Sequence, residues 1–249
     1  MIIYDNERID SVNDSLSLIQ KPDGLTFGTD ALLLAGYVTG RHSAGAELGG
    51  GSGIISMLML TRDKISTSVA YEVQEEYAEL ISRNAEYNSL SHRLTSVCAD
   101  IRELGVSESF DIVYTNPPYM KSSSGKSNLS DKKTIARHEI FGDIRDFTGA
   151  ASRILKFGGA FYAVYRPDRL TDIICAMRAC GIEPKRITFV HADTDAEASM
   201  VLIEGKRGGK SGLQLTKPLI IYKDKTHKEY RDEMNYIMQN GSFPPEYKR

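Results

Sequence analysis

Four consecutive residues, Asn116-Pro117-Pro118-Tyr119, carry the groups needed to hold a planar amino group. They follow an apolar run, residues 110–115, that predicts a buried strand. The two prolines end this strand because they cannot donate to a β-ladder. Asn116 offers a carboxamide oxygen, the prolines offer backbone carbonyls and Tyr119 offers an aromatic face. Together they can accept hydrogen bonds from an amino group and stack on the ring that bears it. An ordinary turn is the alternative interpretation, since Asn-Pro commonly starts turns.

A glycine-rich segment lies earlier in the chain, at Glu47-Leu48-Gly49-Gly50-Gly51-Ser52-Gly53. Its alternate glycines allow a tight turn from a strand into a helix and a close approach of the backbone to a ligand. The spacing differs from the G-x-G-x-x-G pattern of dinucleotide-binding loops. The leading carboxylate would repel a phosphate and attract a cationic amino acid or a sulfonium. The segment therefore predicts a binding loop for a cationic ligand.

Two further acids follow predicted strands. Glu72 is placed to grip ribose hydroxyls, and the adjacent Val73 offers an apolar surface to an adenine ring. Asp100 can accept a hydrogen bond from an adenine amino group. Each acid alone is typical of a solvated loop. Their order along the chain, at the ends of successive strands, favours one shared ligand site.

Strands must bring these residues together. Predicted strands and helices alternate between residues 44 and 180, which indicates an α/β fold with a mostly parallel, doubly wound sheet. Two late strands without a helix between them predict an antiparallel hairpin at the sheet edge. Thr29 or Asp30 is predicted to cap the first helix. The remaining predicted elements are helices at about 31–35, 54–60, 74–88, 143–156, 167–180 and 227–238, and strands at 14–20, 44–48, 67–72, 94–98, 160–165, 187–191 and 200–204.

Composition agrees with one large α/β domain over residues 1–249. The 249 residues divide into an N-terminal cap segment with a hairpin and a helix (1–43), a catalytic core (44–205) and a basic C-terminal extension (206–249). No apolar run has the length of a membrane span, and the N-terminus lacks a signal-peptide pattern. Three cysteines without metal-ligand spacing predict neither a disulfide framework nor a metal site, and they favour the cytoplasm.

Basic residues are concentrated in two segments, although the whole chain has a formal net charge of −2. Residues 120–137 hold five basic residues against one acidic residue, a net charge of +4. Residues 205–249 hold ten basic against five acidic residues, a net charge of +5. This asymmetry suits a polyanionic substrate, although surface lysines are the alternative explanation.

Taken together, the glycine loop, Glu72, Asp100 and Asn116–Tyr119 resemble the class I S-adenosylmethionine-dependent methyltransferases that act on planar amino nitrogens. Residues 27–35, 136–139, 155–159 and 197–199 look like the bacterial tRNA(Val) adenine-N6 methyltransferase family. That resemblance implies a Rossmann-like fold with a seven-stranded sheet. It also implies methyl transfer from S-adenosylmethionine to the N6 amine of an adenine in a tRNA anticodon loop. Its further implications are an RNA partner, no metal or membrane, and a monomer or weak dimer.

The resemblance assigns roles to individual residues. The implied catalytic residues are Asn116, Pro117, Pro118 and Tyr119. The implied cofactor-binding residues are Thr29, Asp30, Glu47, Gly49, Gly51, Gly53, Glu72, Val73, Asp100, Ile101 and Asn116. The implied RNA-binding residues are Tyr119, Lys121, Lys126, Lys132, Lys133 and Arg137.

Other interpretations share the motif. A protein-glutamine N5 methyltransferase or an rRNA guanine-N2 methyltransferase would use the same four residues. The basic loop argues against a protein substrate. A module that binds S-adenosylmethionine without catalysis is a further alternative. His138 invites a general-base role, but a structural role near a helix start is favoured.

Overall fold

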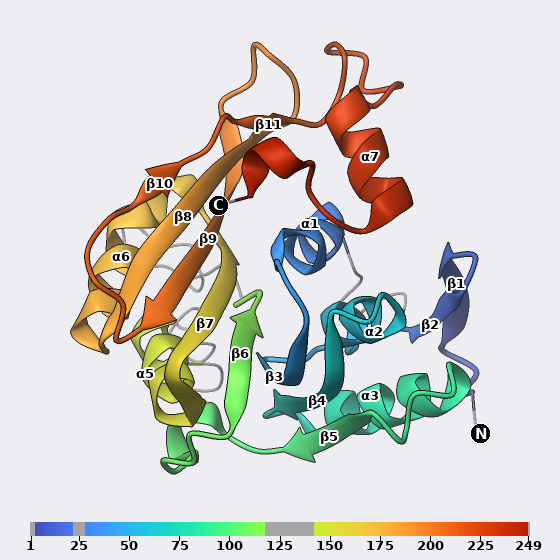
Figure 1. Cartoon of the computed structure of the whole chain (residues 1–249). Helices are drawn as coiled ribbons and strands as arrows, with labels where there is room; N and C mark the ends of the chain where they lie inside the picture. Colours follow the sequence, from blue (N-terminus) through green and yellow to red (C-terminus); the bar gives the residue numbers. More distant parts are fainter. Residues whose placement is uncertain (1–2, 22–27, 118–141, 249) are drawn as a thin grey trace, which may run out of the picture.

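The computed structural model describes residues 3–21, 28–117 and 142–248 and centres on one twisted sheet (Figure 1). Seven long strands form it in the order β5-β4-β3-β6-β7-β9-β8, and the two short strands β10 and β11 pair with β8. Only β9 runs antiparallel to its neighbours, so the predicted mostly parallel sheet with a final antiparallel hairpin is confirmed. The strands are β3 His42–Leu48, β4 Ile65–Glu72, β5 Leu94–Cys98, β6 Phe110–Thr115, β7 Leu155–Tyr165, β8 Ile182–His191, β9 Ala198–Arg207, β10 Gln214–Leu215 and β11 Leu219–Ile220.

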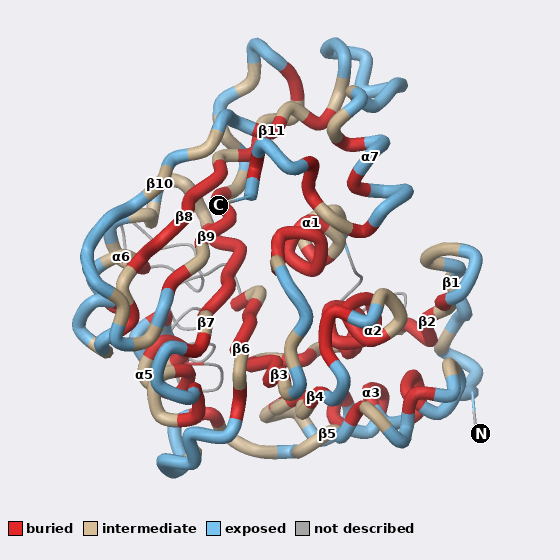
Figure 2. The backbone as a smooth tube through the Cα atoms, viewed as in Figure 1, coloured by how far each residue is buried: buried red, intermediate tan, exposed pale blue. Residues whose placement is uncertain are grey.

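Helices cover both faces of the sheet, and strand side chains alternate between two apolar cores. In β6, Ile112 and Tyr114 face the core beneath the helices α1, α2, α3 and α7, whereas Val113 faces the core beneath α5 and α6. This alternation follows from the two-residue period of a strand, and it leaves the central strands buried on both sides (Figure 2). The helices are α1 Thr29–Tyr37, α2 Ile54–Thr61, α3 Glu75–Tyr87, α5 Ile144–Ile154, α6 Leu170–Ala179 and α7 Asp232–Asn240.

Several predicted boundaries were wrong. Helix α1 begins after Gly28, so neither Thr29 nor Asp30 is its N-cap residue. Helix α5 ends at Ile154, because β7 starts directly at Leu155 rather than at residue 160. Gly158 has a φ of +80° and lies where the β6–β7 register shifts, so it belongs to an irregularity within a strand and does not terminate a helix. The C-terminal helix also begins later than predicted, at Asp232.

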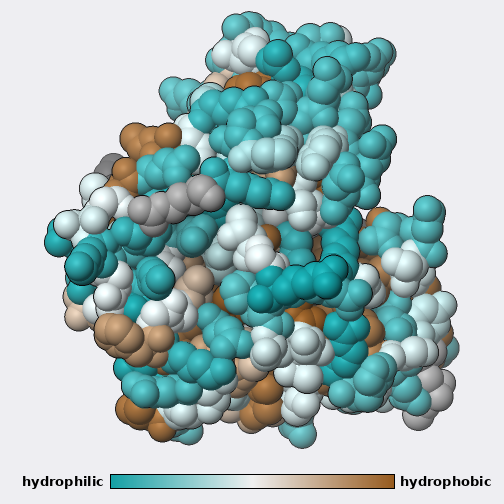
Figure 3. Space-filling model, viewed as in Figure 1, coloured by the Kyte–Doolittle hydropathy of each residue, from teal (hydrophilic) through white to brown (hydrophobic). Residues whose placement is uncertain are grey.

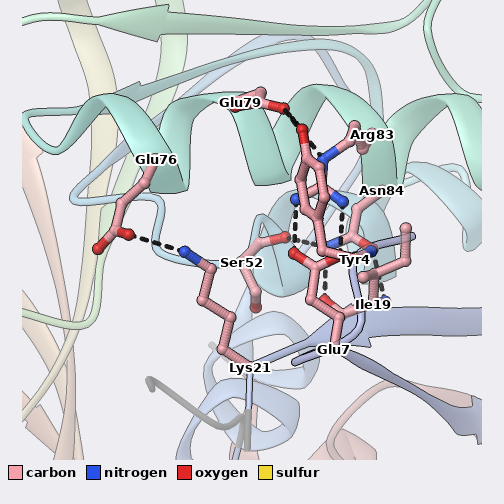
Figure 4. Close-up of polar contacts among 9 residues, drawn as sticks. All are labelled: Tyr4, Glu7, Ile19, Lys21, Ser52, Glu76, Glu79, Arg83 and Asn84. Atoms are coloured by element: carbon pink, nitrogen blue, oxygen red, sulfur yellow. Dashed lines mark hydrogen bonds and ion pairs between the residues drawn. The ribbon is translucent and has the colours of Figure 1, made fainter. Parts of the chain in front are cut away.

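An N-terminal hairpin, β1 (Arg8–Asn13) with β2 (Leu16–Gln20), is fastened to α3 (Figure 4). Asn84 is fully buried and exchanges hydrogen bonds with the backbone of Ile19 at 2.7 and 3.1 Å. Its amide nitrogen also donates to the carbonyl of Ser52 at 3.1 Å. One side chain therefore joins the hairpin, α3 and the glycine-rich loop. The Arg83 guanidinium adds a two-point contact to the Glu7 carboxylate, with both distances 2.7 Å.

The C-terminal segment packs on the core through a buried arginine. Arg186 is 0% exposed and donates to the carbonyls of Tyr37 and Tyr247, each at 2.7 Å. It also forms an ion pair with Glu204 at 2.7 Å and lies over the Tyr37 ring. The outer surface over α7 and the preceding loop is largely hydrophilic (Figure 3). Among the described residues, no helix combines the length and apolarity that crossing a membrane requires.

Candidate active site

Asn116 lies directly after β6, at the carboxyl edge of the sheet, and its side chain is fixed from one side. The amide nitrogen of Asn116 donates to Oδ2 of Asp30 at 2.8 Å, across 86 residues of sequence. The other oxygen of Asp30 accepts the backbone N–H of Ala31 at 2.9 Å. Because an ionised carboxylate can only accept hydrogen bonds, the NH2 group of Asn116 must face Asp30. The carboxamide oxygen therefore points the other way.

This oxygen is a free acceptor. Oδ1 of Asn116 is buried and has no hydrogen-bond partner in the described part of the chain. A buried acceptor without a donor costs free energy until a donor reaches it. Pro117, which is buried beside it, adds a carbonyl with no proline N–H to compete. The end of β6 is thus arranged to accept N–H donors.

The glycine loop joins β3 to α2 on the neighbouring side of β6. Gly49, Gly51 and Gly53 have φ angles of +73°, +54° and +80°, a region that residues with a Cβ rarely adopt. The predicted tight turn is therefore present. Gly50 is required for space, because a Cβ there would lie 2.7 Å from the Ile81 side chain. The loop therefore turns sharply at the carboxyl edge of the sheet, between β3 and α2.

Glu47 lies inside the protein, beneath the glycine loop. It is 1% exposed, and one oxygen of its carboxyl group accepts the backbone N–H of Ser56 at 3.1 Å and the Ser56 hydroxyl at 2.5 Å. The Ser56 hydroxyl lies 2.8 Å from the Tyr114 hydroxyl and 3.0 Å from that of Ser68. Burial raises the pKa of Glu47 to about 8, the bonds from Ser56 oppose this shift, and the nearby Glu72 carboxylate adds to it. No sequence pattern predicted this hydroxyl network.

Glu72, at the end of β4, supports the same loop. Its two oxygens accept the backbone N–H groups of Gly51 and Gln74, both at 3.0 Å. The side chain thereby fixes the loop and retains lone pairs for a further donor. Val73, which follows it, is half-buried.

Asp100, after β5, is engaged by its neighbour. Its carboxylate accepts the backbone N–H of Arg102 at 2.8 Å and the Arg102 guanidinium at 2.9 Å. These hydrogen bonds hold the pKa of Asp100 below its usual range. Ile101 is buried in the core beneath α5 and α6, so its side chain helps to position the turn.

Pro118, Tyr119, His138 and the basic side chains of the loop lie outside the described residues. Among the described residues, the sheet edge brings Asn116, Asp30, Glu72 and the glycine loop together. The Asp30–Asn116 contact was missed because no local pattern links residues so far apart in sequence. The basic loop residues outside the described part are Lys121, Lys126, Lys132, Lys133 and Arg137.

Comparison with known proteins identifies the family of this chain. The family profile described as the methyltransferase small domain matches residues 22–169, more than half of the chain. The chain belongs to this family. The matched range spans α1, the glycine loop, Glu72, Asp100 and Asn116, so the candidate site lies within the family's domain.

Individual relatives were found by sequence and by structure. A tRNA1(Val) (adenine(37)-N6)-methyltransferase of Phocaeicola vulgatus is 28% identical over 185 residues, which is 72% of this chain and 76% of that protein. The enzyme of the same name from Porphyromonas gingivalis is 26% identical over 71% of this chain and 72% of that protein. A predicted O-methyltransferase of Agrobacterium tumefaciens has a TM-score of 0.71 at 23% identity, covering 86% of this chain and 98% of that one. At this identity the last comparison establishes the fold alone.

Proposed function

We propose that the protein transfers a methyl group from S-adenosylmethionine to the N6 amine of an adenine in a tRNA anticodon loop. The observation that carries the proposal is the buried, unpartnered Oδ1 of Asn116, whose orientation is set by Asp30. The curated relatives named for adenine 37 of tRNA1(Val) support adenine as the base.

The role of Asn116 follows from the weak nucleophilicity of the amine. An adenine amino group is a poor nucleophile because its lone pair is delocalised into the ring. Oδ1 of Asn116 and the carbonyl of Pro117 each accept one N–H, which draws the nitrogen towards a tetrahedral geometry and localises its lone pair. S-adenosylmethionine supplies an activated methyl group on its sulfonium. Catalysis by this chain is then positioning and electrostatics, with the proton leaving after transfer. Tyr119 is predicted to stack on the base.

The proposed cofactor site is at the glycine loop, on the β3 side of Asn116. The glycines with positive φ have no Cβ to keep a ligand from the loop backbone, and Glu72 retains acceptor capacity for ribose hydroxyls. Asp100 lies on the adenine side of the same edge. Glu47 is assigned a supporting role beneath the loop, because it is buried among hydroxyls. These residues fit a cationic, ribose-bearing cofactor. Val73 and Ile101 complete the proposed cofactor wall.

RNA is proposed as the substrate because of the basic residues that follow the motif. An unpaired loop base can enter a site without disrupting a duplex, and its phosphates can meet lysines at the mouth. The full chain is proposed to act in the cytoplasm as one unit, a monomer or weak dimer without metal. The packing of the C-terminal segment through Arg186 supports that unit.

The test uses purified protein and labelled S-adenosylmethionine with either bulk tRNA or a protein extract. We expect label in tRNA, recovered as N6-methyladenosine after digestion to nucleosides. Asn116→Ala should abolish transfer and keep the dissociation constant for the cofactor within about threefold, because Oδ1 acts on the acceptor. Near-wild-type turnover by Asn116→Ala would refute the mechanism.

The same assay separates the rival functions. Label in protein, recovered as N5-methylglutamine, would identify a glutamine methyltransferase. Label in rRNA as N2-methylguanosine would identify the guanine enzyme. Cofactor binding without transfer to either fraction would indicate a non-catalytic module.

A further inference from the structure

A cavity lies next to Asp30, the hydrogen-bond partner of Asn116, on the side of β6 away from the glycine loop. Its volume is about 220 Å³. It is formed by the start of α1, the residue after β7 and the first residues of β9. Asp30 connects the cavity to Asn116, since it lines the cavity and accepts the hydrogen bond from the Asn116 amide. The lining residues are Thr29, Asp30, Arg166, Ser199 and Met200.

The strand order explains this location. Strand β6 pairs with β3, which leads into the glycine loop, on one side and with β7 on the other. Strand β9 then pairs with β7, with Val201 opposite Tyr165. Arg166 and Met200 therefore lie at the same carboxyl edge as Asn116. Asn116 therefore lies between the glycine loop, on the β3 side, and the cavity, on the β7 side.

The cavity is lined by groups of opposite charge. Its lining includes one acidic residue, Asp30, and one basic residue, Arg166. Arg166 is held by Asp168, with nitrogen–oxygen distances of 2.8 and 2.6 Å, and neither side chain is buried. A guanidinium fork binds phosphate oxygens in two-point geometry. The half-buried Met200 offers a thioether that can lie against an aromatic ring.

We propose that this cavity receives the target nucleotide, with Arg166 binding its phosphate and Met200 contacting its base. The inference rests on the proposed RNA substrate and adds the subsite that holds it. In the free enzyme Asp168 pairs with Arg166. On binding, a phosphate replaces Asp168 as the partner of the guanidinium. The base extends past Asp30, so that its amino group reaches Oδ1 of Asn116 and not the amide nitrogen that Asp30 holds.

A surface ion pair that only stabilises the turn before α6 is the competing explanation. The two explanations predict opposite effects on RNA binding when Asp168 is removed. If the ion pair only stabilises the turn, removing either Arg166 or Asp168 should change RNA binding in the same direction. If Arg166 binds phosphate, Asp168 competes with the substrate, so its removal should strengthen RNA binding.

The test measures kcat, the KM for a tRNA transcript and the cofactor dissociation constant over a series of salt concentrations. Arg166→Ala should raise the KM about tenfold and lower the salt slope of log KM by about 0.7 to 0.9, as expected for one lost phosphate contact. Asp168→Asn should lower the KM about two- to threefold because it frees the guanidinium. Met200→Ala should raise the KM and leave the salt slope unchanged. Cofactor binding should stay within about twofold in all three variants.

The matched control is Arg178→Ala. Arg178 is also an exposed arginine paired with a carboxylate, that of Glu183, but it lies at the opposite edge of the sheet. Its KM and salt slope should equal those of the wild type. An unchanged KM in Arg166→Ala, or a raised KM in Asp168→Asn, would overturn the nucleotide subsite while leaving tRNA methylation intact. A wild-type protein that methylates protein and not RNA would overturn both proposals together.

Discussion

Asp30 should control the rate of methyl transfer through Asn116, and two substitutions test this. Asp30→Ala removes the acceptor that sits 2.8 Å from the Asn116 amide nitrogen. A hydrogen bond to a charged group contributes about 1.5–3 kcal/mol. If that free energy orients Oδ1 for catalysis, kcat should fall about 10- to 150-fold.

Asp30→Asn gives a graded version of the same change. It keeps the size of the side chain but loses the charge, and a neutral hydrogen bond has roughly half the strength of a charge-assisted one. It also allows the amide to turn and donate to Asn116. We expect kcat to fall about 4- to 12-fold, between the wild type and Asp30→Ala.

The assay is steady-state transfer from labelled S-adenosylmethionine to tRNA, with cofactor binding measured separately by calorimetry. Asp232→Asn is the matched control, since Asp232 is an exposed aspartate in the first turn of α7. It should leave kcat unchanged. The sequence-based expectation that Asp30 binds the cofactor predicts a weakened dissociation constant with kcat retained at saturation. That outcome would refute the positioning role.

Two further predictions concern stability. Burial raises the pKa of Glu47 to about 8 from an ordinary value of 4.5, so the folded state holds a proton that the unfolded state has lost between those values. Urea titrations of the wild type and Glu47→Gln test this. Between pH 6 and pH 9 the unfolding free energy of the wild type should fall by about 3 kcal/mol relative to that of Glu47→Gln. Parallel pH profiles of the two proteins would contradict this. Asn84→Asp should destabilise the protein by about 3–5 kcal/mol and weaken cofactor binding, because a buried carboxylate would face the carbonyls of Ile19 and Ser52. The control is Asn240→Asp, because Asn240 lies at the exposed end of α7, and it should change the unfolding free energy by less than about 0.5 kcal/mol. Equal losses of unfolding free energy in the two variants would contradict the reasoning.

Much of the fold could be predicted because its signals are local. The two-proline stop fixed the end of β6 at Thr115, and the alternation of strands and helices predicted the parallel sheet. Strands β10 and β11 were missed because two residues are too few to show a period. The start of β7 was misplaced because Gly158 resembles a helix stop, although it occupies an irregular position within the strand.

The sequence predicted which residues form the candidate site better than it predicted what their side chains contact. The acids and glycines could be identified from their spacing after strands. What each side chain contacts depends on tertiary structure. Asp30 meets Asn116 across 86 residues, and Glu47 turns inward to Ser56 rather than to an open edge. Arg166 had no sequence signal, since its position beside the cavity depends on the order of β6, β7 and β9.

The central claim is methylation of a tRNA adenine through Asn116. Its most direct test is mass spectrometry of tRNA nucleosides from cells with the gene, without it, and with the gene carrying Asn116→Ala. We predict that N6-methyladenosine in tRNA is present in the first strain and lost in the other two. An unchanged level of N6-methyladenosine in the strain without the gene would contradict the account.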